Sequence, residues 1–109
     1  MTECLFCQIV SGNVPSTKVY EDSDTYAFYD IHPIAPVHFM IIPKRHVDSL
    51  LHCGPEHNAM LGKLLSLVPV LAREQGLTEG FKTQINTGRA GGQEIFHLHV
   101  HVFGNKALT

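Results

Sequence analysis

The stretch Phe96-His97-Leu98-His99-Val100-His101-Val102-Phe103 decides most about the fold of this 109-residue chain. Polar and apolar residues alternate along it, and a repeat of two residues is typical of a β-strand with one buried face. We therefore expect the three histidines to lie on one face and Leu98, Val100 and Val102 to enter a core. Neighbouring histidines on that face would be about 6.5–7 Å apart.

The rest of the chain predicts an α+β fold, with a mostly antiparallel five-stranded sheet, one long helix and one short helix. Strands are expected over residues 18–21, 25–31, 37–42, 81–86 and 95–103. The third of these is almost wholly apolar, so we expect it to be central and buried on both faces. The short helix is expected at 5–10 and the long one from Pro55 to Gly76, with Pro69 kinking or splitting it. The length predicts one domain, residues 1–109.

The composition is that of an ordinary globular protein, with 44% hydrophobic and 17% charged residues. The net charge of −2 comes without a basic stripe, so we expect no nucleic-acid partner. No apolar run approaches the ~20 residues that span a bilayer, and nothing resembles a secretory signal. The chain has three cysteines, and an odd number argues against a disulfide framework. We therefore expect a reduced, cytoplasmic protein.

The histidine face offers a specific chemistry. Neutral imidazole is a good nucleophile near pH 7, and a covalent phosphohistidine splits one hard displacement at phosphorus into two easier steps. Neighbouring imidazoles would donate hydrogen bonds to the oxygens that gain charge. A metal-binding strand and a solvent-exposed strand that happens to use histidine are the alternatives.

Several motifs together resemble the histidine triad (HIT) family, and within it the Hint branch of purine nucleoside phosphoramidases. They are His97 to Phe103 and, in order, Tyr29-Asp30-Ile31-His32-Pro33, Pro36-Val37-His38-Phe39, Ile42-Pro43-Lys44-Arg45-His46, Asn86-Thr87-Gly88 and Gly91-Gly92-Gln93. The resemblance implies a homodimer whose sheets join into one ten-stranded sheet. It also implies a purine nucleotide substrate and a nucleotidyl-histidine intermediate.

The resemblance also implies roles for individual residues. His99 would be the nucleophile, while His101, His38 and Gln93 would hold the α-phosphate. The nucleotide would otherwise contact Asp30, Asn86, Leu5, Phe6, Phe28, Ile31, Gly92 and Glu94. The residues alone leave alternatives to these roles. Asp30 could instead form a turn, and His38 could be a buried core histidine. Phe28 and Ile31 could be ordinary core side chains.

Cys4-x-x-Cys7 is half of a tetrahedral zinc site. A redox pair or two buried thiols are the alternatives. Family members with this cysteine pair complete a zinc site with histidines that correspond to His46 and His97. The resemblance therefore implies one structural zinc ion per chain, which would leave His99 and His101 free for chemistry.

Glu94 departs from the family pattern, since many relatives carry serine there beside the bond that is cleaved. Its carboxyl group could protonate a leaving amine or face solvent. The function expected is hydrolysis of purine nucleoside phosphoramidates. The alternatives are a dinucleoside polyphosphate hydrolase, a nucleotide-binding module with vestigial activity, and a zinc-storage protein.

Overall fold

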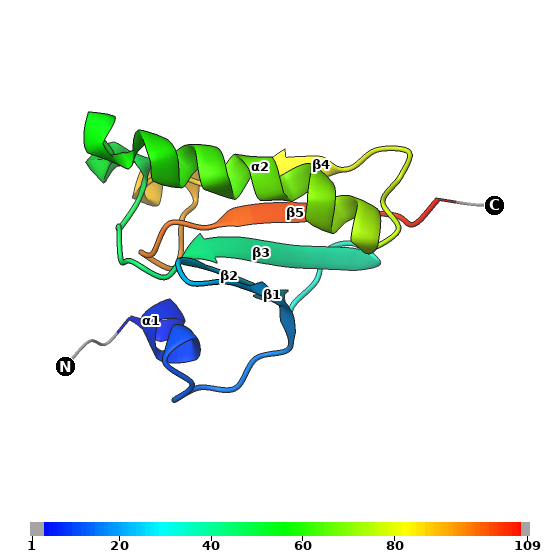
Figure 1. Ribbon diagram of the computed structural model, residues 1–109, viewed down its shortest axis with the longest axis horizontal. Helices are drawn as coiled ribbons and strands as arrows, with labels where there is room; N and C mark the ends of the chain where they lie inside the picture. The colour runs from blue at the N-terminus through cyan, green and yellow to red at the C-terminus, as the bar shows by residue number, and fades with distance from the viewer. Residues whose placement is uncertain (1–3, 108–109) are drawn as a thin grey trace.

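The fold is an antiparallel five-stranded sheet with a helix on each face (Figure 1). The computed structural model describes residues 4–107, so residues 1–3 and 108–109, the ends of the expected domain, lie outside the described residues. In space the strands follow the order β1-β2-β3-β5-β4, and every neighbouring pair is antiparallel. They are β1 (Lys18–Glu21), β2 (Thr25–Tyr29), β3 (Val37–Pro43), β4 (Lys82–Gln84) and β5 (Val100–Gly104). The predicted α+β class and sheet are confirmed.

Strand β3 is the centre of the sheet, as its apolar sequence predicts. All of its residues are buried, and it pairs with β2 on one side and β5 on the other. Its alternate side chains serve different faces of the sheet. Phe39 and Ile41 join the main hydrophobic cluster, while Met40 and Ile42 join a second cluster.

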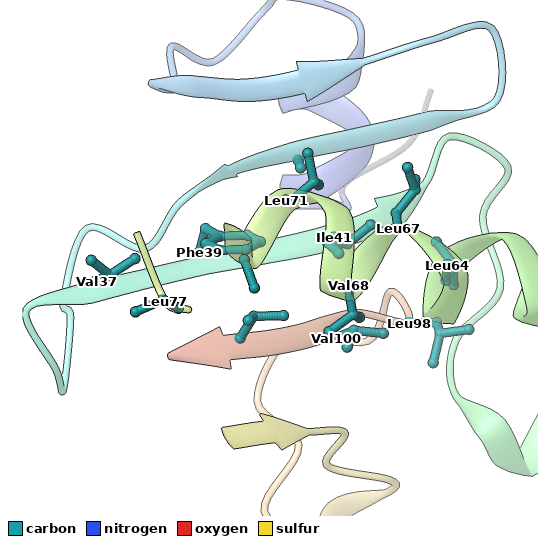
Figure 2. Packing of buried hydrophobic residues seen from close by; sticks show 13 residues of the cluster. Val37, Phe39, Ile41, Leu64, Leu67, Val68, Leu71, Leu77, Leu98 and Val100 are labelled. Carbon is teal, nitrogen blue, oxygen red and sulfur yellow. The ribbon is translucent and has the colours of Figure 1, made fainter. Parts of the chain in front are cut away.

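The long helix α2 (Asn58–Glu74) lies along one face of the sheet and packs against its central strands (Figure 2). The buried residues that pack there are Ala27, Val37, Phe39, Ile41, Leu64, Leu67, Val68, Leu71, Ala72, Leu77, Leu98, Val100 and Val102. Gly76 follows the helix with a φ of 88°, a left-handed conformation that favours glycine. Short 3₁₀ turns at Leu50–His52 and Pro55–His57 precede the helix.

The predicted split at Pro69 is wrong, because α2 runs through this proline as one α-helix. Pro69 has no N–H to offer the carbonyl of Leu65, one turn earlier. Both residues lie on the exposed face of the helix, so water can bond that carbonyl. Val68 and Leu71 on the opposite face remain packed against the sheet.

The last strand is shorter than predicted. Strand β5 begins at Val100, although the sequence predicts a strand from residue 95. Continued by two residues, the register of β3 and β5 would pair His99 with Ile42 and then Leu98 with Pro43, which has no N–H for a ladder. The Leu98 N–H donates instead to the carbonyl of Val47, at 2.7 Å. The alternation of sides nevertheless continues, since Leu98 is buried under α2 with Val100.

The opposite face of the sheet is covered by the short helix α1 (Leu5–Val10) and the segment after it (Figure 1). Cys4 caps α1, its sulfur accepting a hydrogen bond from the Cys7 N–H at 3.3 Å. Phe6 and Ile9 pack against aromatic and aliphatic side chains of β2 and β3, namely Tyr26, Phe28, Met40 and Ile42. None of the helices in the described chain is both apolar enough and long enough to cross a bilayer.

Candidate active site and metal centre

A pocket of about 560 Å³ opens between α1 and the sheet, which is a size suited to a small-molecule ligand. Its apolar wall comes from α1, β2 and the loops beside them. The residues of this wall include Leu5, Phe6, Ile9, Val14, Phe28, Ile31 and Ile34. Its polar wall includes Asp30, His38, Gln84, Asn86, Glu94, His99 and His101. The pocket thus places most of the residues predicted to bind a nucleotide around one cavity.

The ring of His38 is held in a single tautomer by the main chain. The Ile34 N–H donates to His38 Nδ1 at 3.2 Å, so the ring proton lies on Nε2. His38 Nε2 is 3.0 Å from His101 Nδ1 and donates its proton there. The remaining proton of neutral His101 is therefore on Nε2, where it can serve as a donor to an anionic oxygen.

The ring of His99 is oriented by the main chain two residues earlier. Its Nδ1–H donates to the carbonyl of His97 at 2.8 Å, and its unprotonated Nε2 is left for attack. The ring is 6% exposed and lies edge-on to Phe6, with ring centres 5.1 Å apart. His101 is next to it, with ring centres 4.8 Å apart. The predicted common face of His99 and His101 is therefore present in the pocket.

Burial keeps these rings neutral. It lowers the pKa of His38 and of His99, although the Asp30 carboxylate opposes the shift in both. Burial, reinforced by neighbouring His99 and His38, lowers the pKa of His101 to about 4. At pH 7 all three rings are thus uncharged, with a lone pair on His99 Nε2 and an N–H donor on His101.

Asp30 forms a turn and also lies on the wall of the pocket. Its Oδ1 accepts the N–H of His32 at 2.8 Å, which is the geometry of a turn-forming aspartate. Its Oδ2 lies 3.5 Å from His38 Nε2 and 4.0 Å from His101 Nδ1, on the pocket wall. Asn86 also lines the pocket, and its side-chain oxygen accepts from Gln84.

Gln93 requires a correction, because its side chain does not line the pocket. Its two Nε2 protons donate to the carbonyls of Asp48 and Ile95, at 2.7 and 2.9 Å. Its Oε1 accepts the Gly88 N–H at 2.8 Å. No amide proton remains for a phosphate, so Gln93 shapes the glycine-rich loop instead. That loop brings Gly92 and Glu94 to the pocket.

The cysteine pair meets two histidines at the end of α1. Cys4 Sγ is 3.3 Å from His97 Nδ1, and Cys7 Sγ lies 3.4 Å from His46 Nδ1 and 3.5 Å from His97 Nδ1. Tetrahedral zinc with ordinary Zn–S and Zn–N bonds places sulfur and nitrogen ligands about 3.5 Å apart. All four ligand atoms lie within 4.8 Å of one another. These residues therefore fit a closed Cys₂His₂ zinc site.

The outer nitrogens of both histidines are already bonded as metal ligands require. His97 is fully buried, and its Nε2–H donates to the Pro43 carbonyl at 2.7 Å. His46 Nε2 lies 2.5 Å from Asp48 Oδ1. Each bond puts the ring proton on Nε2 and leaves the Nδ1 lone pair facing the sulfurs. Sequence inspection missed Asp48, although an acidic residue close to a ligand histidine is a usable signal.

Asp30, His38 and His101 form a second cluster of possible metal ligands. The hydrogen bonds argue against a metal there. The Ile34 N–H occupies His38 Nδ1, so His38 Nε2 carries a proton and cannot offer a lone pair. That same proton occupies the Nδ1 lone pair of His101. The cluster is better suited to donating hydrogen bonds than to holding a cation.

Comparisons with known proteins agree with this geometry. The family model of the HIT domain matches residues 11–108. The chain belongs to the HIT family. Protein HitA of Neisseria gonorrhoeae is 53% identical over 104 residues, covering 95% of this chain and 97% of that protein. A 14 kDa zinc-binding protein of Brassica juncea is 40% identical over 109 residues, covering 98% of this chain and 96% of its own.

Solved structures of the family have the same fold. A HIT family hydrolase from Legionella pneumophila Philadelphia 1 superimposes with a TM-score of 0.92 at 39% identity, covering 98% of this chain and 96% of that one. A histidine triad nucleotide-binding protein from Candida albicans gives a TM-score of 0.84 at 35% identity. That match covers 96% of this chain and 76% of the Candida chain.

Proposed function

We propose that this protein hydrolyses purine nucleoside phosphoramidates, such as adenosine 5′-monophosphate amides, to the nucleotide and an amine. The observation that carries the proposal is the tautomer set of the pocket histidines. His99 presents a free Nε2, and the His38–His101 pair ends in a donor. Two structural relatives, a HIT family hydrolase and a histidine triad nucleotide-binding protein, support the same class of reaction.

The reaction would proceed in two displacements. His99 Nε2 attacks phosphorus, the P–N bond breaks, and the amine leaves with a proton taken up in that step. Water then attacks the nucleotidyl-histidine, the bond from phosphorus to His99 breaks, and a proton is released. His101, positioned by His38, would donate to the phosphoryl oxygens as charge develops on them. Asp30 would accept hydrogen bonds from the ribose hydroxyls, and Asn86 would bind near the phosphate and ribose. Leu5, Phe6, Phe28 and Ile31 would hold the base.

Charge in the pocket favours this substrate over dinucleoside polyphosphates. Among the described residues that line the pocket, the carboxylates are Asp30 and Glu94, and no lysine or arginine is present. A polyphosphate chain carries several negative charges, which neutral imidazoles would compensate poorly. A phosphoramidate carries a single charge at phosphorus. Both substrates assayed side by side would separate the two functions.

The decisive experiment traps the intermediate. Protein quenched during turnover of an adenosine phosphoramidate is expected to show an adenylyl adduct on the peptide that contains His99, by mass spectrometry. His99→Ala is expected to lose turnover by at least about 10³-fold while still binding AMP, because it removes the nucleophile and not the pocket. Full activity of that variant would exclude the mechanism. AMP binding by the wild-type protein with no turnover of any substrate would indicate a module with vestigial activity.

The zinc site and the dimer belong to the same proposal. One zinc ion per chain would be held by Cys4, Cys7, His46 and His97 in a structural role, whereas a storage protein would bind more than one. A homodimer would form through β4, whose residues are exposed at the edge of the sheet. Metal analysis and the mass of the protein in solution test these two points. A cytoplasmic location and a single domain over residues 1–109 remain predictions.

A further inference from the structure

We propose that the Cys₂His₂ centre controls nucleotide binding, because it anchors the wall of the pocket and orients the nucleophile. The inference rests on the proposed function, since it takes a nucleotide as the ligand. Beyond a general gain in stability, it assigns the metal a specific effect on one pocket. It also assigns Asp48 as the positioning residue of the centre.

The first connection runs through helix α1. This helix has six residues, far fewer than an isolated helix needs to be stable in water. Among the described residues, the side-chain hydrogen bonds that join α1 and its cap to the loops beside the sheet all involve Cys4 and Cys7. The helix is otherwise held to the sheet by the apolar contacts of Phe6 and Ile9. A metal bound to both sulfurs would therefore be the main directional restraint on this helix.

The position of α1 decides the shape of the pocket. Leu5, Phe6 and Ile9 all line it from the helix. Phe6 lies edge-on to Phe28 across the apolar end, with ring centres 5.4 Å apart. The same ring contacts His97 and His99, at 6.0 and 5.1 Å between centres. Loss of the anchor would thus open the side of the pocket where a base would stack.

The second connection runs through the main chain of His97. The ring of this residue is a metal ligand, and its carbonyl accepts the Nδ1–H of His99 at 2.8 Å. Its Nε2–H is fixed to the Pro43 carbonyl at the end of β3. One residue therefore joins the metal to the group that holds the nucleophile in its reactive tautomer.

The third connection starts at Asp48. Its carboxylate orients His46, and its backbone carbonyl accepts the side-chain amide of Gln93. Gln93 in turn accepts the N–H of Gly88, which begins the glycine-rich loop of the pocket. Asp48 therefore touches both a ligand of the metal and the support of the loop that carries Gly92 and Glu94.

The test measures AMP affinity by calorimetry in zinc-loaded and chelator-treated protein, with zinc content determined by elemental analysis. If the anchor is lost and α1 is docked a tenth of the time, the Kd for AMP rises about tenfold. Cys7→Ser is expected to reproduce that rise. The matched control is Cys53→Ser, which removes the cysteine outside the metal centre and should change neither zinc content nor AMP affinity.

Asp48→Asn separates positioning from structure. We expect its zinc affinity, measured by chelator competition, to fall by about tenfold because His46 loses its carboxylate partner. Excess zinc should then restore AMP binding to the wild-type value. A variant that stays impaired at saturating zinc would overturn the role given to Asp48.

Hydrogen exchange locates the effect. Removal of zinc is expected to reduce protection in residues 5–10 while residues 58–74 stay protected. An equal Kd for AMP with and without zinc would overturn the inference and leave the proposed function intact, whereas unfolding of the whole chain would overturn the claim of a local anchor. Failure of the zinc-loaded wild type to bind AMP at all would instead contradict the proposed function.

Discussion

The two faces of the sheet are built from the same strands, but one is an apolar core and the other carries a pocket. Under α2, Phe39, Ile41 and Val100 are almost completely buried and purely apolar. On the other face, the neighbours His38 and His101 from those strands line an open pocket. The contrast shows that alternation along two central strands lets one sheet hold an apolar core on one face and a histidine-lined cavity on the other.

This difference between the faces predicts whether a substitution lowers stability or activity. Changes on the α2 face should lower stability and spare the chemistry, and changes on the pocket face should do the reverse.

His101→Asn should lower activity far more than a substitution on the α2 face such as Leu71→Ala. It removes the donor that would stabilise the phosphoryl oxygens, and loss of one such donor lowers kcat by about 10²–10³-fold. Because His101 is on the pocket face and neutral at pH 7, the free energy of unfolding at that pH should change by less than about 1 kcal/mol. Single-turnover kinetics and urea unfolding measure the two quantities. A destabilised variant with normal kcat would break the comparison.

Leu71→Ala is the corresponding change on the α2 face. Leu71 is fully buried against the sheet, and truncation of a buried leucine costs about 2–5 kcal/mol of stability. The AMP affinity and kcat of the folded protein should stay within about twofold of wild type, because the cavity forms on the far face. Leu65→Ala, in the same helix but half exposed, is the control and should cost less than about 0.5 kcal/mol.

Much of this separation could be predicted from the sequence, because a repeat of two residues is visible without coordinates. The apolar run of β3 and the His-apolar alternation gave the sheet and both its faces. The four metal ligands came from family resemblance and were brought together as expected. These features depend on spacing along one segment or on motifs that the chain carries intact.

Features that depend on which main-chain group a residue meets could not be predicted. The start of β5 depends on Pro43 lacking an N–H and on Val47 accepting from Leu98. The tautomer of His38 is set by the Ile34 N–H, and Gln93 is occupied by the carbonyls of Asp48 and Ile95. Backbone groups are the same in every residue, so no pattern of side chains reveals which one faces a given ring.

The histidines of the pocket face should make the stability of the protein depend on pH. Histidine in the unfolded chain binds a proton as the pH falls below about 6.5, but folded His101 resists until about 4. The unfolded chain therefore binds more protons between those values, so stability is full above pH 6.5 and falls as the pH drops. His38 and His99 lie beside His101 and share this behaviour in part, because burial also lowers the pKa of each.

Urea unfolding of zinc-loaded protein at pH 7, 6 and 5 measures this slope. His101→Asn removes one titrating group, so its slope should be shallower by about 1 kcal/mol per pH unit. Leu71→Ala should keep the wild-type slope at a lower stability. Parallel curves for His101→Asn and the wild type would mean that His101 is not the group that resists protonation.

Glu94→Gln should have the smallest effect, a change in the preference between charged and neutral leaving amines. Glu94 is exposed and lines a pocket without lysine or arginine, so we expect it to favour a leaving amine that carries a second ammonium group. An exposed charge pair is weak, about 0.2–1 kcal/mol, so the preference over a neutral amine of equal length should be about 2–5-fold in kcat/KM. Glu94→Gln should erase it, and Glu74→Gln at the end of α2 should not. If Glu94 instead protonates the leaving group, the variant would slow both substrates equally and leave their ratio unchanged, which would rule out charge selection at this position.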